Sequence, residues 1–238
     1  MENITLLKRD IKKLERLILS LYKSVRPDDT LRKGSLCSIK GREYELSCFE
    51  NIRHSDKVVK LGGGSSHEPD IFMNGGHIEL KPDKSPDWGQ TILKWDGDSN
   101  KWVPNNDLFQ KYMDKVEFRP PPFLFKNMLY DEWLKIKHDY SDEYIDINEQ
   151  EIQNFYRKKG CAYIQIKGGY GLYHLGEDPL ELNVPEFNVK QRIRIRVKIH
   201  SKTNSQLSVT AAFQPIDIQD LKPSVYSLDD KMRLPPNL

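Results

Sequence analysis

The first part of the chain has the spacing of apolar residues that is typical of an amphipathic helix. Over residues 1–25 the apolar positions recur at alternating intervals of four and three, with lysines and arginines between them; they are Ile4, Leu7, Ile11, Leu14, Ile18, Leu21 and Val25. This spacing places an apolar seam along one side of a helix. Pro27-Asp28-Asp29 ends the helix, because proline cannot continue the hydrogen-bond ladder and aspartates favour turns. We expect a heptad helix over residues 1–27 whose seam packs on the rest of the chain or on a second copy, so a monomer and a homodimer both remain open.

The rest of the chain predicts a single α/β domain over residues 28–238. Runs rich in β-branched residues, separated by glycine, proline and aspartate, predict strands. In the first half these strands are Lys57–Leu61, Asp70–Met73, His77–Lys81 and Thr91–Trp95. In the second half, alternating apolar and polar residues predict strands of an antiparallel sheet, namely Cys161–Lys167, Gly171–Leu175, Arg192–His200 and Gln206–Phe213. Helical spacing predicts helices over 41–53, 106–117, 125–138 and 148–159, the last capped by Asp146-Ile147-Asn148.

Composition narrows the class of protein. With 37% hydrophobic residues among 238, the chain can build a core, which excludes a disordered or collagen-like protein. No apolar run approaches the roughly 20 residues that span a bilayer, and Met1-Glu2-Asn3 does not begin a signal peptide, so we expect no membrane partner. Cys37, Cys48 and Cys161 form no CxxC pair, which argues against a disulfide framework or a zinc site and favours a cytoplasmic protein. The net charge of +2 indicates no class of partner, because a near-neutral total can hide a strongly basic face.

The segment from Pro69 to Lys81 carries the candidate chemistry. Its Asn74-Gly75-Gly76 sequence predicts a hairpin turn, because tight hairpin turns need residues that tolerate positive φ. In the resulting antiparallel pair, the two-residue period of a strand puts Glu79 and Lys81 on one face, and the partner strand can bring Asp70 beside them. Neighbouring carboxylates repel each other and are usually relieved by a hard divalent cation such as Mg²⁺, while an adjacent lysine can polarise or deprotonate a water. A plain surface hairpin with a Glu/Lys ladder is the alternative.

A third carboxylate lies in the helix predicted before this hairpin. Cys48, Phe49 and Ile52 follow Glu45 at i+3, i+4 and i+7, so the carboxylate shares the apolar face of that helix. A buried acid needs a partner. At the edge of the apolar stripe, Glu45 would instead reach water.

Pro69-Asp70, a gap of eight residues and then Glu79-Leu80-Lys81 resemble the PD-(D/E)xK signature of type II restriction endonucleases and related DNA-repair nucleases. The resemblance implies a restriction-endonuclease-like mixed central sheet flanked by helices. It implies that Asp70 and Glu79 hold Mg²⁺, or Mn²⁺ in its place, and that Lys81 serves the attacking water.

The same resemblance extends to the flanks of the hairpin. It implies that Glu45 makes a further metal or water contact and that Gln90 lies close to the site. Over residues 42–93 the order of these motifs is most similar to the HhaI-type branch of restriction endonucleases.

One late strand is predicted to carry a basic face. Arg192–His200 alternates strictly, so its isoleucines and valine face a core while the basic residues form one ribbon, namely Arg192, Arg194, Arg196, Lys198 and His200. Such a ribbon can lie along phosphates or enter a major groove. Side chains suited to reading bases follow at Lys202, Asn204 and Gln206, and a second exposed hairpin tip carries Lys167 and Tyr170. A solvated sheet face and simple surface turns are the alternatives.

The residues and the resemblance together lead us to expect a Mg²⁺-dependent type II restriction endonuclease. It would hydrolyse phosphodiester bonds of double-stranded DNA at a short specific sequence. A DNA-repair or junction-resolving nuclease of the same fold is the alternative among enzymes. A DNA-binding module without the chemistry is the alternative outside them, and the complete set of Asp70, Glu79 and Lys81 argues against it.

Overall fold

The computed structural model describes residues 29–62, 68–125, 128–148, 150–201 and 206–238. The chain divides into two units, Met1–Ser47 and Cys48–Leu238. Helix α2 (Asp29–Ile52) supplies the described residues of the first unit, and its last residues belong to the second. The helix begins earlier than the predicted start at residue 41, and the predicted heptad helix over residues 1–27 lies outside the described residues.

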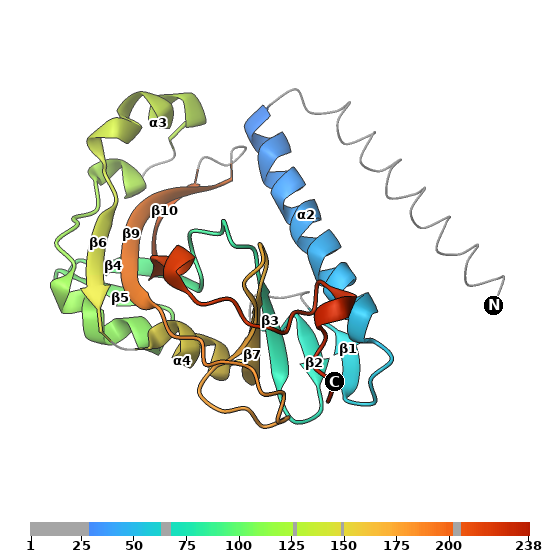
Figure 1. The fold of residues 1–238 in the computed structure, drawn as a ribbon. Helices are drawn as coiled ribbons and strands as arrows, with labels where there is room; N and C mark the ends of the chain where they lie inside the picture. The colour runs from blue at the N-terminus through green and yellow to red at the C-terminus, as the bar shows by residue number, and fades with distance from the viewer. Residues whose placement is uncertain (1–28, 63–67, 126–127, 149, 202–205) are drawn as a thin grey trace. The chain divides into compact units, whose positions relative to one another are not determined.

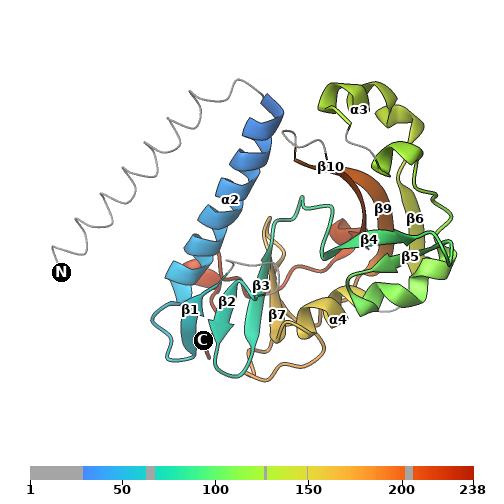
Figure 2. The same ribbon diagram turned by 180° about the vertical axis from the view of Figure 1, so that it is seen from behind.

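The second unit contains two sheets of five strands each. The first sheet has the order β1-β2-β3-β7-β8, with bounds β1 (Val58–Leu61), β2 (Ile71–Met73), β3 (His77–Lys81), β7 (Cys161–Ile166) and β8 (Gly171–His174). Strand β3 pairs antiparallel with β2 and parallel with β7, beside which it lies in Figures 1 and 2. This sheet is therefore mixed.

The second sheet is antiparallel throughout. Its order is β5-β4-β10-β9-β6, with bounds β4 (Gln90–Asp96), β5 (Lys101–Pro104), β6 (Glu143–Ile147), β9 (Lys190–Ser201) and β10 (Gln206–Ile216). The long strands β9 and β10 curve together across Figure 1. The two sheets make the protein a mixed α/β structure that is rich in antiparallel strands.

A crossover links the parallel strands β3 and β7, because two parallel neighbours cannot be joined by a tight turn. The chain between Lys81 and Cys161 provides this crossover and also carries three strands of the second sheet, β4, β5 and β6. Its helices are η1 (Asp107–Lys115), η2 (Pro122–Phe125), α3 (Tyr130–Ile136), η3 (Lys137–Asp139) and α4 (Glu151–Arg157). Two further turns, η4 (Ile218–Asp220) and η5 (Lys231–Arg233), lie in the C-terminal segment. The second sheet is thus built from the crossover and the late β9–β10 hairpin.

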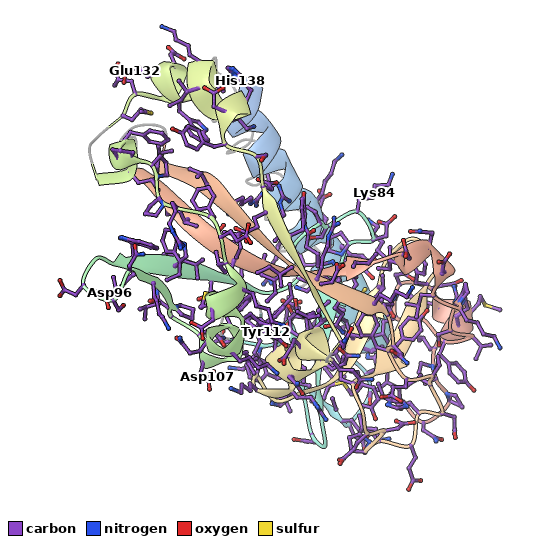
Figure 3. The ribbon with its side chains drawn as sticks, turned by 90° about the vertical axis from the view of Figure 1, so that its left-hand side faces the viewer. Lys84, Asp96, Asp107, Tyr112, Glu132 and His138 are labelled. Carbon is purple, nitrogen blue, oxygen red and sulfur yellow. The ribbon has the colours of Figure 1, made fainter. Side chains whose placement is uncertain are left out.

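Aromatic side chains join the second sheet to the helices of the crossover. The ring of Phe213 on β10 stacks on Phe109 of η1 at 4.0 Å between centroids and meets Phe155 of α4 edge-on at 6.2 Å. Tyr112 of η1 donates a buried hydrogen bond of 3.0 Å to Glu151, the first residue of α4. Figure 3 shows Tyr112 between these two helices. Apolar packing therefore holds helix α4 against the sheet, and a buried hydrogen bond holds it against η1.

The predicted strands are confirmed, but the assignment of the last four of them to one antiparallel sheet is wrong. Strands β7 and β8 belong to the first sheet and β9 and β10 to the second. Alternation shows that a segment is a strand and does not show which strand it pairs with. Strands β5 and β6 were not predicted. No helix in the described ranges is long and apolar enough to cross a membrane.

Three of the helix predictions also need correction. Asp146-Ile147-Asn148 is no helix cap, because Ile147 ends strand β6 and α4 begins only at Glu151. The segment 106–117 forms a 3₁₀ helix rather than an α-helix, with Asn106 accepting a hydrogen bond from Leu108 at its start. In the segment predicted as a helix over 125–138, residues 128–138 contain the short helix α3 followed by the start of η3.

Candidate active site

The hairpin that carries the candidate chemistry forms as predicted. Strands β2 and β3 pair antiparallel through Ile71 and Ile78, and both Gly75 and Gly76 in the turn have positive φ. His77 closes the turn by accepting a hydrogen bond from the backbone N–H of Met73 at 3.1 Å. This ring is therefore a structural neighbour of the site.

The carboxylate of Asp70, the residue before β2, is bound to the backbone of β3, the strand that carries Glu79. Oδ2 of Asp70 accepts a hydrogen bond of 2.7 Å from the backbone N–H of Leu80. Leu80 is the residue after Glu79, so this hydrogen bond anchors Asp70 beside Glu79, the second acid of the motif. Glu79 itself is only 2% exposed, because β3 is an inner strand covered by its neighbours. A carboxylate at that depth costs several kcal/mol of desolvation unless cations compensate for it.

Two lysines provide that compensation. Lys81 Nζ lies 2.5 Å from Oε1 of Glu79, as the shared strand face predicts, and Lys159 Nζ lies 3.5 Å from Oε2. Among the described residues, Oε2 of Glu79 accepts no hydrogen bond although it is buried. A buried carboxylate oxygen that accepts no hydrogen bond is suited to binding a cation.

The surroundings keep Lys81 protonated. Burial by itself lowers the pKa of the Lys81 ammonium, but the phenol of Tyr156 and the carboxylates of Glu79 and Asp70 outweigh burial and raise this pKa above its ordinary value. The ammonium lies 5.0 Å from the centre of the Tyr156 ring. Lys81 is therefore a cationic hydrogen-bond donor in the ligand-free chain rather than a proton acceptor.

Three residues of this cluster were not predicted from the sequence. Tyr156 lies in the last turn of α4, and Lys159 lies two residues after the end of this helix. Cys161 is the first residue of β7. Burial raises the pKa of Tyr156 and of Cys161, and Glu79 adds to both shifts, so both groups lie near this acid. Lys159 lies 3.5 Å from it. Only the parallel pairing of β3 with β7 brings them there. No local sequence pattern predicts that pairing, although the sequence does predict a helix over 148–159 followed by a strand at Cys161–Lys167.

The donor set fits a magnesium-type ion held by two carboxylates. The described residues contain no cluster of three or more His, Cys, Asp or Glu side chains that could hold a metal. Mg²⁺ usually keeps several waters and takes one or two carboxylates together with substrate phosphates, so Asp70 and Glu79 suffice for such a site. Cys161 is a buried free thiol.

The two remaining predicted members of the site lie on other elements. Glu45 belongs to the first unit, where it pairs with Arg42 at 2.7 Å with 21% of its side chain exposed, so its role as a further ligand stays a prediction. Gln90 is the exposed first residue of β4 in the second sheet, where its side chain accepts a hydrogen bond of 3.3 Å from Lys198. Its role near the metal also stays a prediction.

The alternation of β9 is confirmed. Ile193 and Ile195 are fully buried, while the opposite side of the strand carries the set that we call the basic face: Arg192, Arg194, Arg196 and Lys198. The side chains of His200, Lys202, Asn204 and Gln206 lie outside the described residues, so their predicted contacts with DNA stay predictions.

The basic face is partly neutralised by acids that the sequence pattern did not reveal. Asp87 lies 3.4 Å from Arg194 and 2.7 Å from Arg196, and Asp142 lies 2.7 Å from Arg194. Arg192 instead lies 4.1 Å from the centre of the Tyr144 ring and donates to Gln214, an uncharged acceptor, at 3.0 Å. The positive charge of Arg192 is therefore less neutralised by neighbouring acids than that of Arg194.

The predicted hairpin tip at Lys167 and Tyr170 is only partly exposed. Lys167 is exposed, but the ring of Tyr170 is half-buried and packs against the main hydrophobic core. The expectation of an exposed aromatic residue at this tip is wrong, because the core recruits the ring.

Comparison of the chain with protein-family models, with curated proteins and with solved structures finds no match.

We expect Glu79→Gln to lower the free energy of unfolding by about 3 kcal/mol, because Lys81 and Lys159 would lose the buried carboxylate that both contact. Urea denaturation in the presence of a chelator measures this difference. Asp114→Asn is the matched control, since it removes the acid of the exposed pair with Lys101 and should leave stability nearly unchanged. Equal stability of Glu79→Gln and the wild type would show that the lysines do not depend on this acid.

Proposed function

We propose that the chain is a Mg²⁺-dependent endonuclease that hydrolyses phosphodiester bonds of double-stranded DNA, of the type II restriction class. The observation that carries the proposal is the buried carboxylate of Glu79, with Asp70 anchored to the next backbone N–H and Lys81 on its Oε1. The three residues of the Asp-and-ExK motif therefore converge, as a hydrolytic site would require.

The sheet around the motif supports the same proposal. The strand that carries Glu79 and Lys81 has an antiparallel neighbour on one side and a parallel neighbour on the other, reached through a crossover that ends in α4. This arrangement agrees with the mixed central sheet that the resemblance implies.

Asp70 and Glu79 are the residues that would hold Mg²⁺ or Mn²⁺. When bound, the ion would supply charge stabilisation for the transition state and a lowered pKa for a bound water. The buried strand of Glu79 gives a rigid ligand, and the hydrogen bond from Leu80 fixes Oδ2 of Asp70. Rigid placement of this kind limits reorganisation when charge develops.

Lys81 has the role of a donor in this site. Its ammonium lies 2.5 Å from Oε1 of Glu79, where its N–H groups would orient a water or a phosphate oxygen and its charge would stabilise the reacting phosphate. Tyr156 fixes the ammonium from the side of α4 and covers it with an aromatic ring. The proton of the attacking water is then accepted elsewhere, by solvent or by a phosphate oxygen.

The basic face is the proposed contact with the DNA backbone. Its four cations exceed the two acids that touch them, so a net positive field remains on this side of β9. Phosphate contacts of this kind position a duplex, and base contacts give sequence specificity.

Cleavage of a long plasmid in Mg²⁺ tests the proposed function. We expect discrete fragments from the wild type, and no cleavage from Asp70→Asn or Lys81→Ala because each lacks one member of the site. Both variants should still shift a duplex in Ca²⁺, since they leave the basic face intact. Asp114→Asn is the control variant, because Asp114 is exposed and far from the motif in sequence. It should cut DNA as the wild type does.

The other outcomes separate the alternative functions. A smear, or cutting of branched substrates alone, indicates a repair or junction-resolving nuclease. Binding without cutting indicates a DNA-binding module. Cleavage by either variant at a rate near that of the wild type would mean that the site is elsewhere.

Salt titrations of DNA binding test the basic face. Arg192→Ala should weaken binding to cognate and scrambled duplexes alike and reduce the slope of log K against log[salt] by about 0.9, the effect of one lost phosphate contact. Arg194→Ala should reduce the slope less, because Asp87 and Asp142 already neutralise part of its charge. Lys101→Ala removes an exposed cation from edge strand β5 of the same sheet and is the matched control. Identical slopes for all of these proteins would show that this face is only a solvated sheet surface.

A further inference from the structure

Lys159 lies on the side of Glu79 that the motif leaves unexplained. The motif accounts for Lys81 on Oε1, whereas Lys159 lies 3.5 Å from Oε2, the oxygen that accepts no hydrogen bond from the described residues. Its side chain is 13% exposed, so this ammonium is largely removed from water.

The position of Lys159 is fixed by the end of α4. Its backbone N–H donates to the carbonyl of Tyr156 at 2.9 Å, and its ammonium lies 5.1 Å from the Tyr156 ring centre and 5.5 Å from the Phe155 ring centre. Aromatic faces attract a cation without neutralising it. The Lys159 ammonium is therefore directed towards Glu79 by the fold and not by a mobile surface contact.

A divalent cation held by Glu79 would compete with this ammonium for Oε2, since Lys81 already lies on Oε1. Two positive groups within a few ångströms of each other repel strongly where water is scarce, and both gain from the same carboxylate charge. The carboxylate also needs a cation at all times, since a buried unpaired charge is costly.

We infer that Lys159 is a built-in counter-ion that competes with the divalent cation for Oε2 of Glu79. It neutralises Glu79 in the free protein and weakens metal binding there. This inference rests on the proposed function, because it takes Asp70 and Glu79 as the metal ligands.

Titration of the full chain with Mn²⁺ alone, followed by the electron paramagnetic resonance of the free ion, tests the inference without measuring activity. We expect Lys159→Met to bind Mn²⁺ at least about tenfold more tightly than the wild type in the absence of DNA, because the competing charge is gone. Lys159→Arg keeps the charge and should bind as the wild type does. Lys159→Gln is a second neutral variant for use if the methionine variant melts early.

Lys158→Met is the matched control. It removes the same charge one residue away, but Lys158 is half exposed and lies 2.8 Å from both carboxylate oxygens of Asp107, a residue on the surface of η1 (Figure 3). Its affinity for Mn²⁺ should stay close to that of the wild type.

The possible failures are distinguishable. If Asp70→Asn abolishes Mn²⁺ binding while both neutral Lys159 variants bind no more tightly than the wild type, the metal site stands and the inference is overturned. If the wild type, Asp70→Asn and the Lys159 variants all lack saturable binding, the metal site of the proposed function is overturned together with the inference.

Discussion

The burial of the Glu79 carboxylate on an inner strand is the constraint on which the rest of the site depends. A charge at 2% exposure must be compensated within a few ångströms, and the ammonium groups of Lys81 and Lys159 provide this compensation. Lys81 comes from the same strand, but Lys159 and Tyr156 come from the end of α4. The site therefore exists only when β3, β7 and the helix between them are assembled, which couples its chemistry to the fold.

The parallel pairing of β3 with β7 has consequences beyond the site. Two parallel neighbours need a long connection, and the connection between β3 and β7 contains β4, β5 and β6, three of the five strands described in the second sheet. The same segment carries Asp87 and Asp142, which contact the arginines of β9. The crossover thus shapes both the proposed hydrolytic centre and the charge of the proposed DNA contact.

Local patterns predicted the parts of this protein that depend on local geometry. The Asn-Gly-Gly turn, the shared face of Glu79 and Lys81 and the alternation of β9 all follow from the two-residue period of a strand or from the conformational demands of a turn. Partners distant in sequence were not predictable in this way. Lys159 meets Glu79 through a parallel pairing, Asp87 meets Arg194 and Arg196 across the second sheet, and Tyr170 is drawn into a core that no single segment reveals.

Anomalous X-ray scattering from crystals of the full chain grown with Mn²⁺ locates a bound ion without reference to activity. We expect a Mn²⁺ peak bonded to the carboxylates of both Asp70 and Glu79, with Lys81 still beside Glu79. Bound Mn²⁺ at another group of residues, with Asp70 and Glu79 free of metal and Glu79 still paired with its two lysines, would contradict this assignment of the metal ligands.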